Sequence, residues 1–87
     1  MEFEITEHAR DELARRSIPI ALLSEVLHSP QQVVPTYGDR VVYQSQVVFG
    51  NGKTYLLRLI VDDNAQPARI VTVYKTSKIG KYWSHSV

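Results

Sequence analysis

Basic and hydroxyl-bearing side chains are concentrated between Val71 and Trp83, in the sequence V-T-V-Y-K-T-S-K-I-G-K-Y-W. Residues 64–87 carry four basic residues and no acidic one, a net charge of +4, whereas residues 1–63 carry six basic and nine acidic residues, a net charge of −3. The whole-chain charge of +1 hides this asymmetry. An acid-free segment indicates a phosphate-bearing partner, and a solvated basic edge is the simple alternative.

Two residues outside this segment could act on a phosphate. Arg58 interrupts the apolar run Y-L-L-R-L-I-V, so its charge must reach solvent or a partner, and a guanidinium binds phosphate oxygens bidentately. His8 carries the side chain that titrates nearest neutrality and is therefore the candidate for proton transfer. The alternatives are an exposed arginine on a half-solvated sheet, and an exposed helix-start histidine bonded to Glu12 or Asp11.

Length and composition predict one globular domain over residues 1–87. The chain is 44% hydrophobic and 22% charged, which is typical of an ordered protein. It has no cysteine, so disulfides and thiolate metal sites are excluded. No apolar run approaches the roughly 20 residues that cross a bilayer, and the acidic N-terminus lacks the apolar part of a signal peptide. We therefore expect a cytoplasmic protein without a membrane segment.

The first third of the chain predicts two short helices. Thr6 is a candidate N-cap, and Ala9 and Leu13 form a narrow apolar stripe in the first helix. Ile18-Pro19 breaks this helix and begins a second, which ends at His28-Ser29-Pro30. The second helix should bury Leu22, Leu23, Val26 and Leu27.

The rest of the chain predicts β-strands joined by turns. Gly50-Asn51-Gly52 is a strong hairpin signal between two β-branched runs. The expected strands are Gln32 to Tyr37 (an edge strand, because of Pro35), Arg40 to Phe49, Lys53 to Val61 and Arg69 to Lys75, with Phe3 to Ile5 as a possible short first strand. The predicted fold class is α+β: two N-terminal helices on one face of a three- to four-stranded antiparallel sheet.

Period-2 alternation assigns side chains to the two faces of this sheet. The side bearing Leu57, Leu59, Val71 and Val73 is the more apolar and should meet the helices. Arg58 should share the opposite face with Ile70, Thr72 and Tyr74. A guanidinium beside a phenol and a hydroxyl on an open face would make an anion cradle.

The segments T-E-H-A-R…R-R-S-I-P…E-V-L-H-S-P and T-V-Y-K-T-S-K-I-G-K-Y-W resemble a family of small bacterial domains. That family is grouped with RelE-like and colicin-like ribonuclease toxins, in the barnase–EndoU–colicin–RelE fold group. The resemblance spans roughly Phe3 to Trp83. It implies a RelE-like fold, RNA as substrate, and a cognate antitoxin as protein partner.

The expected reaction is metal-independent RNA cleavage, in which the ribose 2′-OH attacks its own adjacent phosphate. The protein must remove one proton, donate another and stabilise negative charge, with no metal or cofactor. The candidate catalytic residues are His8, Arg16, Arg58, Tyr74 and Ser77, and the candidate substrate-binding residues are Arg15, Thr72, Lys75, Thr76 and Lys78.

Several of these assignments leave alternatives open. Arg15 and Arg16 compete for the site, and a salt bridge from either to Glu12 or Asp11 is the structural alternative. Tyr82 and Trp83 could stack on a base, but covering the core with the C-terminal tail is favoured. The three histidines have no metal-ligand spacing. The alternative function is a non-catalytic RNA- or protein-binding domain, and the oligomeric state stays open.

Overall fold

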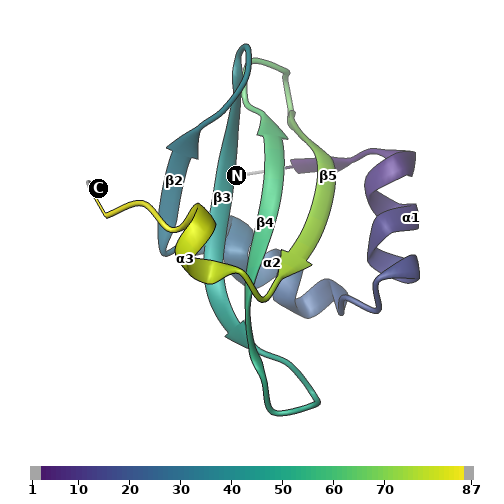
Figure 1. The fold of residues 1–87 in the computed structure, drawn as a ribbon. Helices are drawn as coiled ribbons and strands as arrows, with labels where there is room; N and C mark the ends of the chain where they lie inside the picture. The colour runs from purple at the N-terminus through teal and green to yellow at the C-terminus, as the bar shows by residue number, and fades with distance from the viewer. Residues whose placement is uncertain (1–2, 86–87) are drawn as a thin grey trace.

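The computed structural model describes residues 3–85 (Figure 1). It contains a five-stranded sheet, and in chain order two α-helices precede the four main strands and a short helix follows them. In chain order the elements are β1 (Phe3–Ile5), α1 (Glu7–Arg15), α2 (Ile20–His28), β2 (Gln32–Pro35), β3 (Arg40–Val48), β4 (Thr54–Asp62), β5 (Ala68–Thr76) and α3 (Ile79–Tyr82). The predicted α+β class is confirmed.

Local sequence signals define both long helices. The Thr6 hydroxyl accepts from the Ala9 backbone N–H at 3.1 Å, so Thr6 is the N-cap of α1, as predicted; such a cap stabilises a helix by about 1 kcal/mol. Ser17, at a φ of 54°, turns the chain between the helices. Pro19 lies at the N-cap position of α2, where its missing N–H removes no intrahelical hydrogen bond, and its carbonyl accepts from the Leu22 N–H at 3.1 Å.

The sheet has five strands, in the order β1-β5-β4-β3-β2, where three or four and a possible short first strand were expected. The chain from β2 to β5 is an antiparallel meander, and β3 and β4 are joined by the predicted hairpin, in which Gly52 takes a φ of 80°. The additional strand is the predicted Phe3–Ile5 segment, which pairs in parallel with β5. Alternation cannot identify such a strand's partner, because three residues give too short a pattern.

The helices and one face of the sheet enclose the hydrophobic core. The predicted residues Leu13, Leu23, Val26, Leu27, Leu57, Leu59 and Val73 are all buried in it, and Leu22 is half-buried at its margin. Ala9, Ile18, Phe49, Val61 and Ile70 complete the cluster. The sheet therefore has the predicted face toward the helices.

One face assignment was wrong. Ile70, not Val71, is fully buried in the core. The register passes from the pair Ile60 and Thr72 to the pair Val61 and Ile70, so Val71 is an extra residue in a β-bulge. The bulge shifts the alternation by one residue, which the sequence pattern does not show.

The elements lie in distinct positions around the sheet (Figure 1). The second helix, α2, crosses behind β3 and β4, whereas α1 lies beside β5. The short α3 lies in front, over the opposite face, which we call the open face. Among residues 3–85, no helix is long and apolar enough to cross a membrane.

Candidate functional site

Arg58 is held at the centre of the open face by neutral groups. Its Nε donates to the side-chain oxygen of Gln44 at 2.9 Å, and one Nη donates to the Tyr74 hydroxyl at 2.5 Å. The Tyr82 ring lies over the guanidinium, 4.4 Å from its centroid to Cζ, and packs edge-on against the Tyr74 ring. Because Gln44, Arg58 and Tyr74 are direct cross-strand partners on β3, β4 and β5, the sheet register itself assembles this face cluster.

A second layer of hydrogen bonds fixes the orientation of Gln44, which is 0% exposed. Its amide nitrogen donates to the Gln32 side-chain oxygen at 2.8 Å and to the Tyr82 carbonyl at 3.2 Å. Gln32 in turn donates to the Ser84 carbonyl at 2.6 Å and accepts from the Ser84 N–H at 3.0 Å. The residues after α3 are thereby held across the open face, and not over the core as the sequence predicts.

The charge of Arg58 is not neutralised within the described part of the chain. No carboxylate among residues 3–85 lies within 4.0 Å of its guanidinium. Gln44 and Tyr74 use two N–H groups, and a guanidinium has about five. The remaining donors and an uncompensated charge on a half-buried group favour an anion, and planar N–H pairs suit phosphate oxygens.

His8 lies at the edge of the same face. Its side chain is 65% exposed, and Nε2 lies 3.4 Å from the Thr72 hydroxyl. The Thr6 hydroxyl also donates to the Val71 carbonyl at 3.2 Å, which ties the start of α1 to β5. Thr72 and Tyr74 are two residues apart on one strand face, a separation of about 7 Å, so His8 and the face cluster flank one stretch of β5.

Arg15 and Arg16 belong to a different cluster, centred on Glu12. Both donate to the Glu12 carboxylate, Arg16 through Nε at 2.5 Å, while His8 Nε2 is 4.0 Å away. This is the salt-bridge alternative: both arginines have a carboxylate partner, although one carboxylate offsets only one of their two positive charges. The hydrogen bond from Arg16 lowers the pKa of Glu12 below its ordinary 4.5, against the opposing effect of burial, and Arg15 lowers it further.

The remaining predicted residues divide between the two sides of the sheet. Lys75 faces away from Arg58, with Nζ 4.3 Å from the Phe49 ring centroid and 5.1 Å from that of Tyr55. Thr76 accepts the Lys78 backbone N–H at 3.1 Å, which closes the turn into α3. Ser77 and Lys78 are exposed in that turn. The face cluster therefore contains Arg58 and Tyr74, with Thr72 and His8 at its edge, and lacks Lys75.

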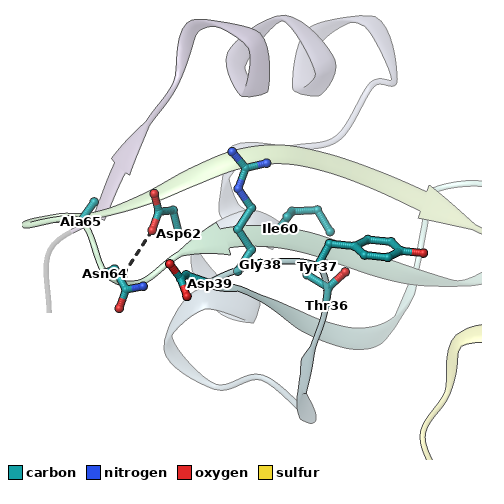
Figure 2. A pocket seen from close by; sticks show the side chains of 9 residues that line it. Thr36, Tyr37, Gly38, Asp39, Ile60, Asp62, Asn64 and Ala65 are labelled. Carbon is teal, nitrogen blue, oxygen red and sulfur yellow. Dashed lines mark hydrogen bonds between the residues drawn. The ribbon is translucent and has the colours of Figure 1, made fainter.

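A hollow of about 750 Å³ opens at the loop end of the open face (Figure 2). Ile60, which pairs with Thr72, contributes from β4, and the loops before β3 and after β4 provide most of the remaining wall. The lining residues are Thr36, Tyr37, Gly38, Asp39, Arg40, Ile60, Asp62, Asn64 and Ala65. Gly38 takes a φ of 66°, which lets the loop turn between Tyr37 and Asp39.

The sequence patterns did not identify Gln32 and Gln44, which position Arg58, or the hollow. One signal was present for Gln44, since a glutamine within the β-branched run of β3 requires a polar partner on one face. The hollow had no such signal, because two loops far apart in sequence form it. Among the residues the structure describes, no three His, Cys, Asp or Glu side chains converge as metal ligands would.

The fold and these clusters define a small α+β domain whose open face holds an arginine without a carboxylate partner among residues 3–85. The chain belongs to the family described as "Domain of unknown function (DUF4258)", whose model matches residues 5–75. That description names no reaction, so the resemblance to RelE-like toxins stays a prediction. No curated protein and no solved structure matches the chain.

Proposed function

We propose that this chain is a metal-independent endoribonuclease toxin that binds RNA on the open face and is silenced by a cognate antitoxin in the cytoplasm. One observation carries the proposal. Arg58 is a half-buried cation with donors left over and no carboxylate partner among residues 3–85. A phosphodiester supplies the missing negative charge and suits the planar donor pattern.

The proposed reaction uses groups that already lie along β5. His8 takes the proton of the ribose 2′-OH, and the 2′-oxygen attacks the adjacent phosphorus while Arg58 stabilises the charge on the phosphate oxygens. The bond to the 5′-oxygen breaks, and that oxygen receives a proton from Tyr74. Tyr74 accepts a hydrogen bond from Arg58, which leaves its own O–H proton free to be donated. The products are a 2′,3′-cyclic phosphate and a 5′-hydroxyl.

The flanking residues have supporting roles in this proposal. Thr72 lies against His8 and orients the ring, while Ser77 and Lys78 are exposed where the strand ends and contact a neighbouring phosphate. Arg15 and Arg16 are assigned to Glu12, so Arg58 alone stabilises the charge. This set is smaller than the one predicted from sequence.

A non-catalytic RNA- or protein-binding domain is the second candidate, and the Tyr82 ring favours it. That ring covers one side of the guanidinium, and the glutamine network holds the tail in place. A face covered in this way can bind a partner through the residues around the covered area, while Arg58 stays inaccessible to a phosphate.

Cleavage of a labelled RNA by the purified protein in excess chelator separates the two candidates. We expect cyclic-phosphate ends, and a single 2′-deoxy substitution at the cut site should stop cleavage while binding persists. Replacing His8 by Ala should slow cleavage about 10²- to 10⁴-fold and relieve growth arrest on expression, because proton transfer is lost. Replacing His28, whose ring nitrogen contacts the Ser24 carbonyl at 2.7 Å, should change neither.

Two results would contradict the enzyme. RNA binding without cleavage under any condition would favour the second candidate. Unchanged cleavage by the His8→Ala protein would remove His8 from the mechanism.

A further inference from the structure

The hollow at the loop end of the open face has an apolar surface beside unpaired acids. Ile60 lies on the sheet, and Tyr37, 93% exposed, extends beside it as a flat ring without a cover (Figure 2). An exposed tyrosine over an aliphatic side chain is a surface on which a planar ring can stack.

The hollow is lined by two carboxylates and one guanidinium, that of Arg40, so its net charge is negative and disfavours a phosphate. Asp39 and Asp62 lie on its other side, away from the Tyr37 phenol (Figure 2). Within residues 3–85 neither carboxylate has a cation within 4.0 Å, and Asp62 accepts only the Asn64 backbone N–H at 3.2 Å. These carboxylates repel phosphate and accept from N–H groups, so the hollow suits a neutral planar ring that carries N–H donors.

The position of the hollow links it to the face cluster. Ile60 and Arg58 lie on the same face of β4, two residues and about 7 Å apart. Ile60 is also the cross-strand partner of Thr72, which contacts His8. The sugar and base of one nucleotide can bridge this separation.

We propose that the hollow binds the base of the nucleotide whose phosphate lies on Arg58, and that it prefers guanine to uracil. Guanine presents two adjacent N–H donors on its Watson–Crick edge, which a carboxylate can accept together, whereas uracil presents one N–H between two carbonyl oxygens. This inference deepens the proposed RNA-cleaving function and rests on it for the placement of the phosphate.

Binding of single-stranded oligoribonucleotides to the His8→Ala protein tests the preference without cleavage. We expect an oligouridylate with one central guanosine to bind about tenfold more tightly than oligouridylate, because a bidentate base contact discriminates by about that factor. Inosine, which lacks the 2-amino group, should lose most of the advantage. The Asp39→Asn/Asp62→Asn protein should bind both oligonucleotides equally, while Asp63→Asn, in the same loop but outside the hollow, should keep the preference.

The aromatic surface is tested separately. Replacing Tyr37 by Ala should weaken binding of the guanosine-containing oligonucleotide about five- to tenfold, and replacing it by Phe should retain the affinity because the ring is kept. RNA binding with no base preference and no effect of Tyr37→Ala would overturn the base site and leave the proposed ribonuclease standing.

Free nucleosides separate failure of this inference from failure of the proposed function. Guanosine, which has no phosphate, should shift the amide resonances of residues 36–40 and 62–65 of the wild-type protein, and uridine should not. If guanosine shifts them while RNA is not bound, the base site stands and the ribonuclease proposal fails. If neither guanosine nor RNA binds, both fail.

Discussion

Arg16 and Arg58 have different electrostatic environments within one small domain. Arg16 is the exposed C-cap residue of α1 and donates to the nearly buried Glu12 carboxylate, which it shares with Arg15. Arg58 lies half-buried on the open face with a glutamine, a tyrosine hydroxyl and an aromatic ring as its neighbours. The first cluster offsets one of its two positive charges with the Glu12 carboxylate, whereas Arg58 has no carboxylate partner among residues 3–85.

The difference shows that the type of residue alone does not predict an anion site. Both arginines donate hydrogen bonds to side chains, but the partner of Arg16 is a carboxylate and those of Arg58 are neutral. A neutral partner fixes the geometry of the guanidinium without using its charge. The Glu12 carboxylate instead contributes to the fold. Glu12 is buried, and its bonds to Arg15 and Arg16 hold the C-terminal end of α1.

The largest difference between the two clusters is expected when each arginine is replaced by lysine. Lysine keeps the charge but cannot donate to Gln44 and Tyr74 in a fixed plane. We expect Arg58→Lys to weaken RNA binding and cleavage about 10- to 100-fold. Arg16→Lys should change both less than twofold, because an ammonium can still neutralise Glu12. Equal losses in the two proteins, from cleavage rates and binding isotherms, would contradict the assignment of the spare charge to Arg58.

A second prediction concerns the support of the face cluster. Gln44→Leu removes the acceptor of Arg58 Nε and the donor to Gln32 and the Tyr82 carbonyl, and buried groups left without partners cost about 1–3 kcal/mol. Urea unfolding should show a loss of this size. Gln46→Leu, on the same face but exposed, should change stability by about 0.5 kcal/mol or less. A stable Gln44→Leu protein would mean that the tail does not depend on this network.

The lysines of the acid-free segment are expected to have a smaller effect on RNA binding, and they test which side of the sheet faces the RNA. Lys78 is exposed in the turn beside the open face, whereas Lys75 lies over Phe49 and Tyr55 on the opposite side. Lys78→Ala should reduce the slope of log affinity for RNA against log salt concentration by roughly one ion. Lys75→Ala should leave the slope unchanged and lower stability instead, through loss of its contact with the aromatic rings. The reverse pattern would place the RNA on the helix side.

The smallest expected effect is a pH dependence of stability from Glu12. Its pKa is lower in the folded chain than its ordinary 4.5, so the unfolded chain binds the proton more readily. The stabilisation is therefore fully present above that value and is lost as the pH falls through the folded pKa. Thermal unfolding of the wild type and of Glu12→Gln should differ near neutral pH and converge in acid. A difference that persists in acid would show a packing effect instead.

Much of the fold could be predicted because the signals are local. Thr6, the joint near Pro19 and the Gly50–Gly52 hairpin each act through a few neighbouring residues, and the alternation of Leu57 and Leu59 identified the buried face correctly. The bulge that exchanges Ile70 for Val71 could not be predicted in this way. It depends on how β5 pairs with β4, and a regular alternating sequence does not show where one residue is left over.

The candidate site was predicted in part for the same reason. Arg58, Thr72 and Tyr74 were placed on one face by alternation alone, and the register brings Arg58 and Tyr74 into hydrogen-bonding contact. Arg15 and Arg16 could not be assigned, because a helical carboxylate three or four residues away competes with any external anion. The position of the tail over Arg58 could not be predicted, because it depends on how far the chain turns back after β5.

The parallel pairing of β1 with β5 joins segments that are far apart in the sequence. The Thr6 hydroxyl bonds to the Val71 carbonyl, 65 positions later in the chain, whereas β3, β4 and β5 pair with sequence neighbours. During synthesis the meander can form first, and the N-terminal strand and helix must wait for β5. His8 reaches Thr72 only then, and the Tyr82 ring arrives later still. A nascent chain therefore lacks the complete surface until both β5 and α3 have been synthesised.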